Sequence, residues 1–151
     1  LIGVFENMLE NIIALAAFIP VILGMGGNIA TQSSTIIVRG MATGRVNEGG
    51  EIKLILKEVQ VGIILGILYG ILLGVFARFT FSSAPKNLGI VVGLSICVSM
   101  IVAATVGTVI PLILRKLDID PAIATGPFVT TSIDILGVLF YFMIAGFFLS
   151  V

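Results

Sequence analysis

Histidine and tryptophan are absent from this 151-residue sequence, and cysteine occurs once, at Cys97. A single chain therefore has no cysteine pair for a disulfide, no Cys/His set for a zinc site and no histidine for a proton shuttle. Charged residues are also scarce, at 11% of the chain, whereas hydrophobic residues make up 58%. Because a soluble domain needs more charge on its surface, this composition indicates an integral membrane protein. We expect the lipid bilayer as its surroundings and no nucleic-acid partner.

Long apolar runs predict an all-α fold of membrane-spanning helices, since a hydrocarbon core of about 30 Å requires about 20 helical residues. Residues 1–5 resemble the last turn of an earlier span. We therefore expect a five-helix transmembrane domain whose first helix is largely missing from this chain. Residues 6–11 are expected to form a turn, and residues 39–57 a loop that leads into an amphipathic start of the next span. The expected spans are residues 12–38, 58–77, 88–114 and 121–150.

Lysine and arginine are distributed unequally between the two sides of the predicted bundle. Six of the eight lie in residues 39–57 and 115–116, and only Arg78 and Lys86 lie on the opposite side. By the positive-inside rule the first group is cytoplasmic. We expect a multi-pass protein of the plasma membrane, with the missing N-terminus and the 39–57 loop in the cytoplasm and the C-terminus outside.

One carboxylate, Asp134, lies in the middle of the last predicted span. An ionised acid at that depth is costly unless it meets water, a cation or a partner, so it is a candidate functional site. Counting back along a helix by three and four residues places Thr131, Thr130, Pro127 and Asp120 on the same face. Pro127 within such a helix would free one backbone carbonyl. Oxygen ligands of these kinds suit hard cations.

The predicted second span is unusually polar for membrane depth. Gly24, Asn28, Thr31 or Gln32, and Thr35 share one face at helical spacing. We expect this face to be turned towards the same place as Asp134. Hydrogen bonding between helices is the alternative explanation for Asn28.

In the predicted third span glycines recur every fourth residue and form one smooth ridge. Because helices approach closely along such rows, we expect tight packing against a neighbouring helix. The glycines are Gly62, Gly66, Gly70 and Gly74.

Each acid also has a structural explanation. Asp134 would be a buried acid kept protonated or paired with a base, but no lysine or arginine lies at membrane depth. Asp120, directly before Pro121, suits the N-cap of the last helix, and Asp118 suits a solvated loop. An enzyme is not expected, because no catalytic pair occurs at plausible spacing. Two classes of function remain open: a divalent-cation channel, and a divalent-cation exchanger driven by sodium or protons that uses the same acid.

Two segments, GMGGNIATQSSTIIVRG at residues 24–40 and DPAIATGPFVTTSID at residues 120–134, resemble the signature segments of the MgtE family of magnesium channels and their solute-carrier relatives. The resemblance implies a homodimer with a cation pore along the dimer axis, between the second and fifth spans. It implies Mg²⁺ as the transported ion and no organic cofactor.

The resemblance also implies roles for particular residues. Asp134 matches the acid that holds the hydrated cation, and Asp120 matches an acid near the cytoplasmic mouth of the pore. Asn28, Thr31 and Gln32 match the pore-facing part of the second span. Thr130 matches a position whose backbone carbonyl lines the pore, and Glu58 is similar to the acid that begins the family's third span.

Overall fold

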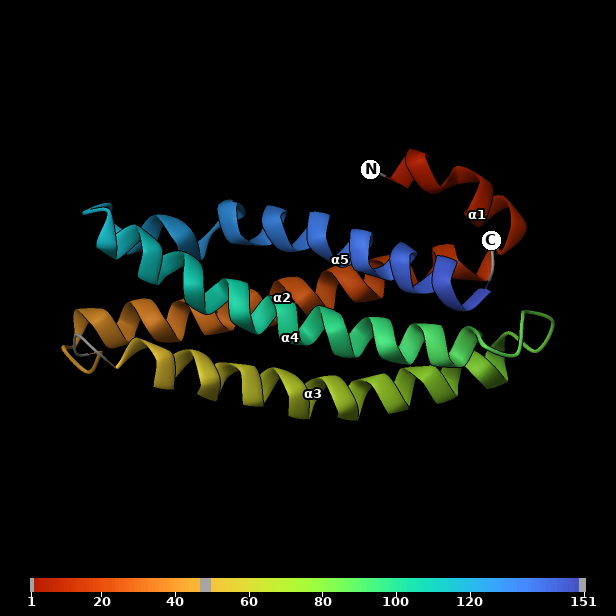
Figure 1. Ribbon diagram of the computed structural model, residues 1–151, viewed down its shortest axis with the longest axis horizontal. Helices are drawn as coiled ribbons and strands as arrows, with labels where there is room; N and C mark the ends of the chain where they lie inside the picture. The colour runs from red at the N-terminus through yellow and green to blue at the C-terminus, as the bar shows by residue number, and fades with distance from the viewer. Residues whose placement is uncertain (1, 47–49, 150–151) are drawn as a thin grey trace.

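The computed structural model describes residues 2–46 and 50–149, and all regular elements in these ranges are helices (Figure 1). Four helices are long and apolar enough to cross a membrane, which confirms the predicted all-α membrane fold. The elements in order are η1 (Ile2–Phe5), α1 (Glu6–Asn11), α2 (Ala14–Ala42), α3 (Glu51–Thr80), α4 (Leu88–Lys116), η2 (Pro121–Thr125) and α5 (Pro127–Leu149).

The four long helices run side by side along the long axis of the molecule (Figure 1). Helix α4 packs against α2, α3 and α5, and α2 also packs against α5. The largest buried cluster joins α2, α4 and α5 through apolar side chains such as Leu15, Ile96 and Phe142. Helix α3 lies outside this three-helix core and is held mainly by α4.

The contact between α3 and α4 depends on glycine. A Cβ atom on Gly74 would lie 2.6 Å from the carbonyl oxygen of Gly89, and one on Gly70 would lie 2.6 Å from that of Gly93. Both distances are shorter than any ordinary carbon–oxygen contact, so the two backbones touch directly. The predicted tight packing of the glycine ridge is confirmed.

Three local predictions were wrong. Residues 6–11 form a short helix, α1, and not a turn. Helix α2 continues to Ala42 and α3 begins at Glu51, so the connection is shorter than the expected 39–57 loop. No proline interrupts either helix there, and the acid at the start of α3 favours a helix N-terminus.

The third error concerns the last span, which is not one helix. It divides at Gly126 (φ −113°, ψ −143°) into the short η2 and the long α5. A proline disfavours α conformation in the residue before it, and glycine adopts extended conformations readily. Pro127 therefore begins α5, where its missing N–H costs nothing, and does not interrupt a longer helix.

Helices η1 and α1 fold back along the end of the bundle where α2 begins (Figure 1). The ring of Phe5 stacks on that of Phe142, with centroids 4.4 Å apart. The segment of η1 and α1 is thereby packed on the last helix.

Candidate functional site

Helix α2 presents one polar face to the outside of the chain. Spacing of three and four residues places its side chains in a row along an open groove of about 520 Å³. The Thr35 hydroxyl donates to the Thr31 carbonyl at 2.8 Å. The amides of Asn28 and Gln32 are exposed and make no hydrogen bond within the described residues. The groove is lined by Asn28, Thr31, Gln32, Thr35, Ile36 and Arg39.

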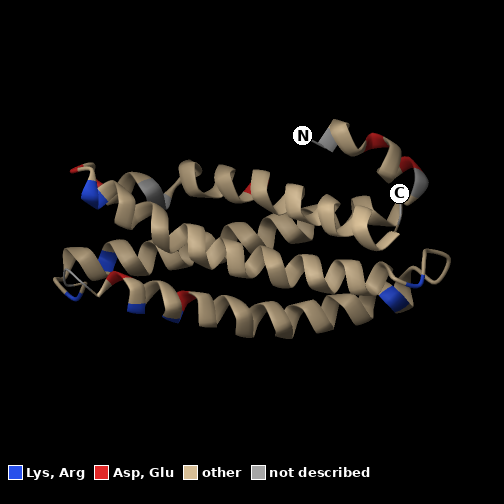
Figure 2. Ribbon diagram, in the orientation of Figure 1, with Lys and Arg blue, Asp and Glu red and all other residues tan. Residues whose placement is uncertain are grey.

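Helix α5 carries the second polar face. Its first two turns bring Pro127, Thr130, Thr131 and Asp134 to one side at helical spacing. The Thr130 hydroxyl donates to the Pro127 carbonyl at 3.3 Å. Asp134 is exposed, and no lysine or arginine of the described ranges pairs with it. Figure 2 shows that charged residues gather at the two ends of the bundle and are rare in between.

The two polar faces lie at the same depth in the bundle. A Cβ on Gly26 of α2 would lie 3.0 Å from Cγ2 of Ile133 of α5, which places these positions opposite each other. Asp134 is the next residue after Ile133, and Asn28 is two residues, or about 3 Å, from Gly26 along the axis. The acid and the amide therefore occur at one level, although they belong to different helices.

Asp120 lies apart from this level, in the connection before η2. Its Oδ1 accepts a hydrogen bond of 2.9 Å from the Ala122 backbone N–H, so it caps η2. Asp118 is also exposed and has a left-handed backbone, with φ 56°. The expected polar stripe from Asp120 to Asp134 along a single helix is wrong, because the helix divides at Gly126. Asp120 therefore caps a helix as expected, but that helix is the short η2 and not the last spanning helix α5.

Glu58 does not belong to the polar groove. It lies on α3, is 6% exposed and accepts a hydrogen bond of 2.8 Å from the Ser33 hydroxyl of α2. Ser33 follows Asn28 by five residues, which rotates it to the buried face of α2. A pairing between residues 25 positions apart gives no local sequence signal, so the sequence alone did not reveal Ser33.

Three further buried hydroxyls, those of Ser34, Ser95 and Ser99, have no hydrogen-bond partner in the described structure. Ser99 projects from α4 to the contact of α2 with α5, where its oxygen lies 2.9 Å from a Cβ placed on Gly26. The sequence could indicate its burial only through its position on the same face of α4 as buried apolar residues such as Ile96 and Ala103. Ser99 lies at the level of Asp134 but on the inner side of the two helices.

The described residues contain no group of three or more Asp, Glu, Cys or His side chains that could hold a metal ion. A cation at the level of Asp134 would meet one carboxylate of this chain and otherwise neutral oxygens. Such a set suits an ion that keeps most of its water, as Mg²⁺ does.

A bundle of four apolar helices that are long enough to span a membrane is typical of a multi-pass membrane protein. The family model described as a divalent cation transporter, MgtE, matches residues 19–144. The chain belongs to the MgtE family.

Three curated relatives named "Magnesium transporter MgtE" are similar to nearly the whole chain. The Bacillus subtilis protein is 39% identical over 145 residues, covering 96% of this chain and 32% of its own length. The Thermus thermophilus protein is 38% identical over 141 residues, covering 93% and 31%. The Enterococcus faecalis protein is 36% identical over 149 residues, covering 99% and 32%. The chain thus spans about a third of the length of these relatives.

Proposed function

We propose that this chain forms the ion pathway of a magnesium transporter of the plasma membrane, with Mg²⁺ moving along the polar faces of α2 and α5. The family and the names of the relatives support a divalent cation as the substrate. The observation that carries the proposal is Asp134, an acid on a spanning helix that is exposed and has no basic partner in the described structure. No other Asp or Glu lies within α5.

The exposure of Asp134 supports a second copy of the chain beside this face. A carboxylate that faces hydrocarbon costs about 2.5–3.5 kcal/mol on insertion scales, and unpaired amides and hydroxyls add to that cost. The cost is removed if the polar faces of two copies meet around water. A two-fold axis beside these faces would bring both Asp134 carboxylates to one pore. We therefore propose a homodimer with the pore on its axis.

Two carboxylates facing one another suit a divalent cation. Mg²⁺ sheds water reluctantly, so the pore would hold it through its hydration shell. The Asp134 pair supplies charge, while Asn28, Thr31, Gln32, Thr130 and Thr131 supply neutral groups that hydrogen-bond to the bound waters. Asp120 and Asp118, exposed at the end of the bundle, raise the local cation concentration without contacting the ion in the pore. Glu58, which is buried against Ser33, would stabilise the helix contact and take no part in conduction.

The orientation follows from charge. The end of the bundle formed by the α2–α3 connection and the end of α4 carries most of the basic residues (Figure 2). The positive-inside rule makes this the cytoplasmic end and places the end of α5 outside. Asp120 then lies at the inner mouth of the pore.

A channel and a coupled exchanger can be distinguished by their driving force. Purified protein in a planar bilayer is given Mg²⁺ as the only permeant cation, with voltage as the only driving force. A Mg²⁺ current supports the proposed channel. Vesicle uptake that starts only with a sodium or proton gradient supports the exchanger, and the absence of flux under both conditions contradicts the proposed function.

The dimer axis is tested by crosslinking. Cys97 is the sole cysteine, so Cys97→Ser gives a background without thiols. Gln32→Cys on the polar face should form a disulfide-linked dimer on mild oxidation. Leu72→Cys, on the exposed apolar face of α3, is the matched control and should remain monomeric. Equal crosslinking at the two positions would contradict an axis beside α2.

A further inference from the structure

The basic end of the bundle contains a cavity that the transport proposal does not use. It lies between the end of α2, residues 43–46 and the start of α3, and it has two adjoining parts of about 550 and 720 Å³. We call it the α2–α3 cavity. Its described lining includes four basic residues, no acid, and apolar side chains such as Leu54. The four basic residues are Arg39, Arg45, Lys53 and Lys57.

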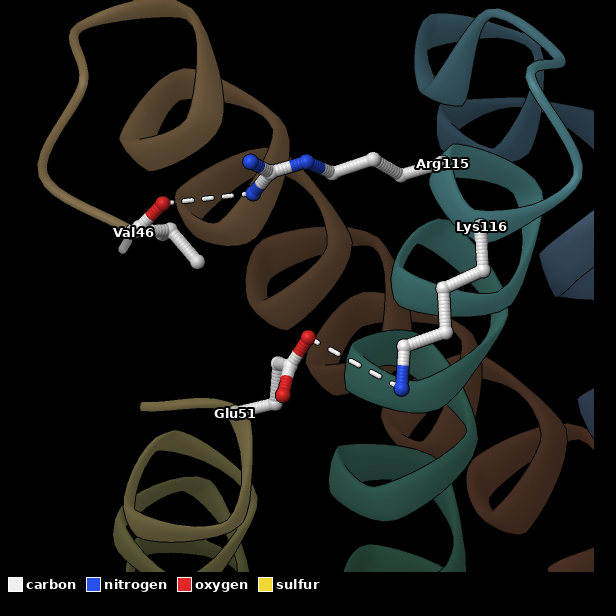
Figure 3. A network of polar contacts seen from close by, with 4 residues as sticks. All are labelled: Val46, Glu51, Arg115 and Lys116. Atoms are coloured by element: carbon white, nitrogen blue, oxygen red, sulfur yellow. Dashed lines mark hydrogen bonds and ion pairs between the residues drawn. The ribbon is translucent and has the colours of Figure 1, made fainter. Parts of the chain in front are cut away.

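The walls of this cavity are fixed by contacts with α4 (Figure 3). Arg115 Nη1 donates to the Val46 carbonyl at 3.2 Å, and Lys116 Nζ lies 3.7 Å from Glu51 Oε1. The Val46 N–H donates to the Gly40 carbonyl at 3.3 Å, which folds Val46 back over the last turn of α2. A Cβ on Gly40 would lie 2.9 Å from Val46 Cγ2, so a larger residue there would displace the Val46 side chain. The cavity is therefore held open before any ligand arrives.

No acid of the described structure neutralises the four basic side chains of the cavity. All four side chains belong to exposed residues, and none forms an ion pair within the described structure. Glu51, the acid at the start of α3, is engaged by Lys116. Glu48 falls outside the described residues. Four cations around one preformed space attract a multivalent or phosphate-bearing anion more strongly than separate surface charges do.

The depth of the cavity in the membrane indicates which kind of anion can reach it. Helix α3 has 30 residues and is about 45 Å long, which exceeds the hydrocarbon core by about 15 Å. Its apolar stretch follows Glu58, so Lys53 and Lys57 lie at headgroup level, one helical turn apart. Basic pockets between helices at this level recognise anionic headgroups. We propose that the α2–α3 cavity binds the phosphate of an anionic phospholipid, whose acyl chains lie along the exposed apolar side of α3.

The opposite end of the bundle provides a comparison. A groove there is lined by two cations, Arg78 and Lys86, together with Gly70, Gly74 and Phe79. It has half the basic residues and an otherwise apolar lining. Neutralising both cations changes the net charge as much as neutralising two cavity lysines, so it is a matched control.

The test is native mass spectrometry of the detergent-purified chain with phosphatidylglycerol or phosphatidylcholine. The unaltered chain should retain phosphatidylglycerol preferentially. Each lysine near an anionic lipid strengthens association about fivefold, so the double variant Lys53→Gln/Lys57→Gln should weaken retention about 25-fold. Arg78→Gln/Lys86→Gln should change it less than threefold. Arg39 is left unchanged because it also borders the polar groove of α2.

A charge-preserving variant separates binding from folding. Lys53→Arg/Lys57→Arg should retain the lipid, and all variants should show the helical circular dichroism of the unaltered chain. Equal retention of both lipids would overturn the proposal, as would equal loss in the Gln variants at the two ends. Binding of inorganic phosphate at the cavity without preference for the anionic lipid would also overturn it, because the ligand would then be a soluble phosphate. A variant that unfolds is replaced by Lys57→Gln alone, for which about fivefold weaker retention is expected.

Discussion

The contact of α3 with α4 depends on the absence of side-chain atoms at Gly70, and Gly70→Ala tests this directly. The new Cβ would lie 2.6 Å from the Gly93 carbonyl oxygen. An ordinary contact needs at least about 3.2 Å, so the two backbones must separate by about 0.6 Å. Overpacking of this kind costs about 1–3 kcal/mol, and alanine regains up to about 1 kcal/mol as the better helix former. Because the obstructing atom is backbone and cannot rotate away, we expect a net loss of about 1–2 kcal/mol.

The assay is reversible unfolding in mixed micelles, followed by circular dichroism. Gly27→Ala is the matched control, because it is also a glycine within a spanning helix but a Cβ there meets nothing within 4 Å. We expect Gly27→Ala to be neutral or slightly stabilising. If Gly70→Ala is as stable as Gly27→Ala, the inferred direct backbone contact between α3 and α4 is wrong.

Three further predictions concern single hydrogen bonds. Tyr141→Phe removes the bond of 2.9 Å from the buried hydroxyl to the Leu15 carbonyl and should lower the free energy of unfolding by about 0.5–1.5 kcal/mol; no change in micelle unfolding would refute this. Ser33→Ala leaves the buried Glu58 carboxylate without its hydroxyl donor and should cost about 1–3 kcal/mol. The loss should be smaller when Glu58→Gln is already present, and a double-mutant cycle measures the difference. Asp120→Asn keeps an oxygen that can accept from the backbone at the N-cap, so Mg²⁺ flux should fall only a few-fold, and complete loss would show that the charge of Asp120 is essential.

The spanning helices could be predicted from the sequence because their signal is local. Each needs only a long apolar run, and the glycine ridge needs only a four-residue repeat along one helix. Gly126 shows where a local signal was misjudged. Helical counting through Pro127 predicted one continuous polar stripe, but a proline after glycine allows the helix to end and restart.

The arrangement of the site could be predicted only in part. Asp134 was evident because an isolated acid in an apolar span is conspicuous, and the polar face of α2 was evident from helical spacing. The common depth of these faces depends on the contact between Gly26 and Ile133, which joins residues more than one hundred positions apart. The Ser33–Glu58 pair and the α2–α3 cavity likewise arise from packing between helices, for which one sequence carries no direct signal.

The central claim is that Asp134 holds the transported ion. Its most direct test is Mg²⁺ influx into proteoliposomes, measured with an enclosed Mg²⁺ indicator, for the unaltered protein and for Asp134→Ala and Asp134→Asn. Because Asp134 is exposed and makes no described ion pair, both variants should fold and give the same circular dichroism and elution volume. We expect flux to be lost in Asp134→Ala and reduced at least tenfold in Asp134→Asn, which keeps the shape but not the charge. Undiminished flux in a folded Asp134→Ala protein would contradict the assignment of the pore to this face.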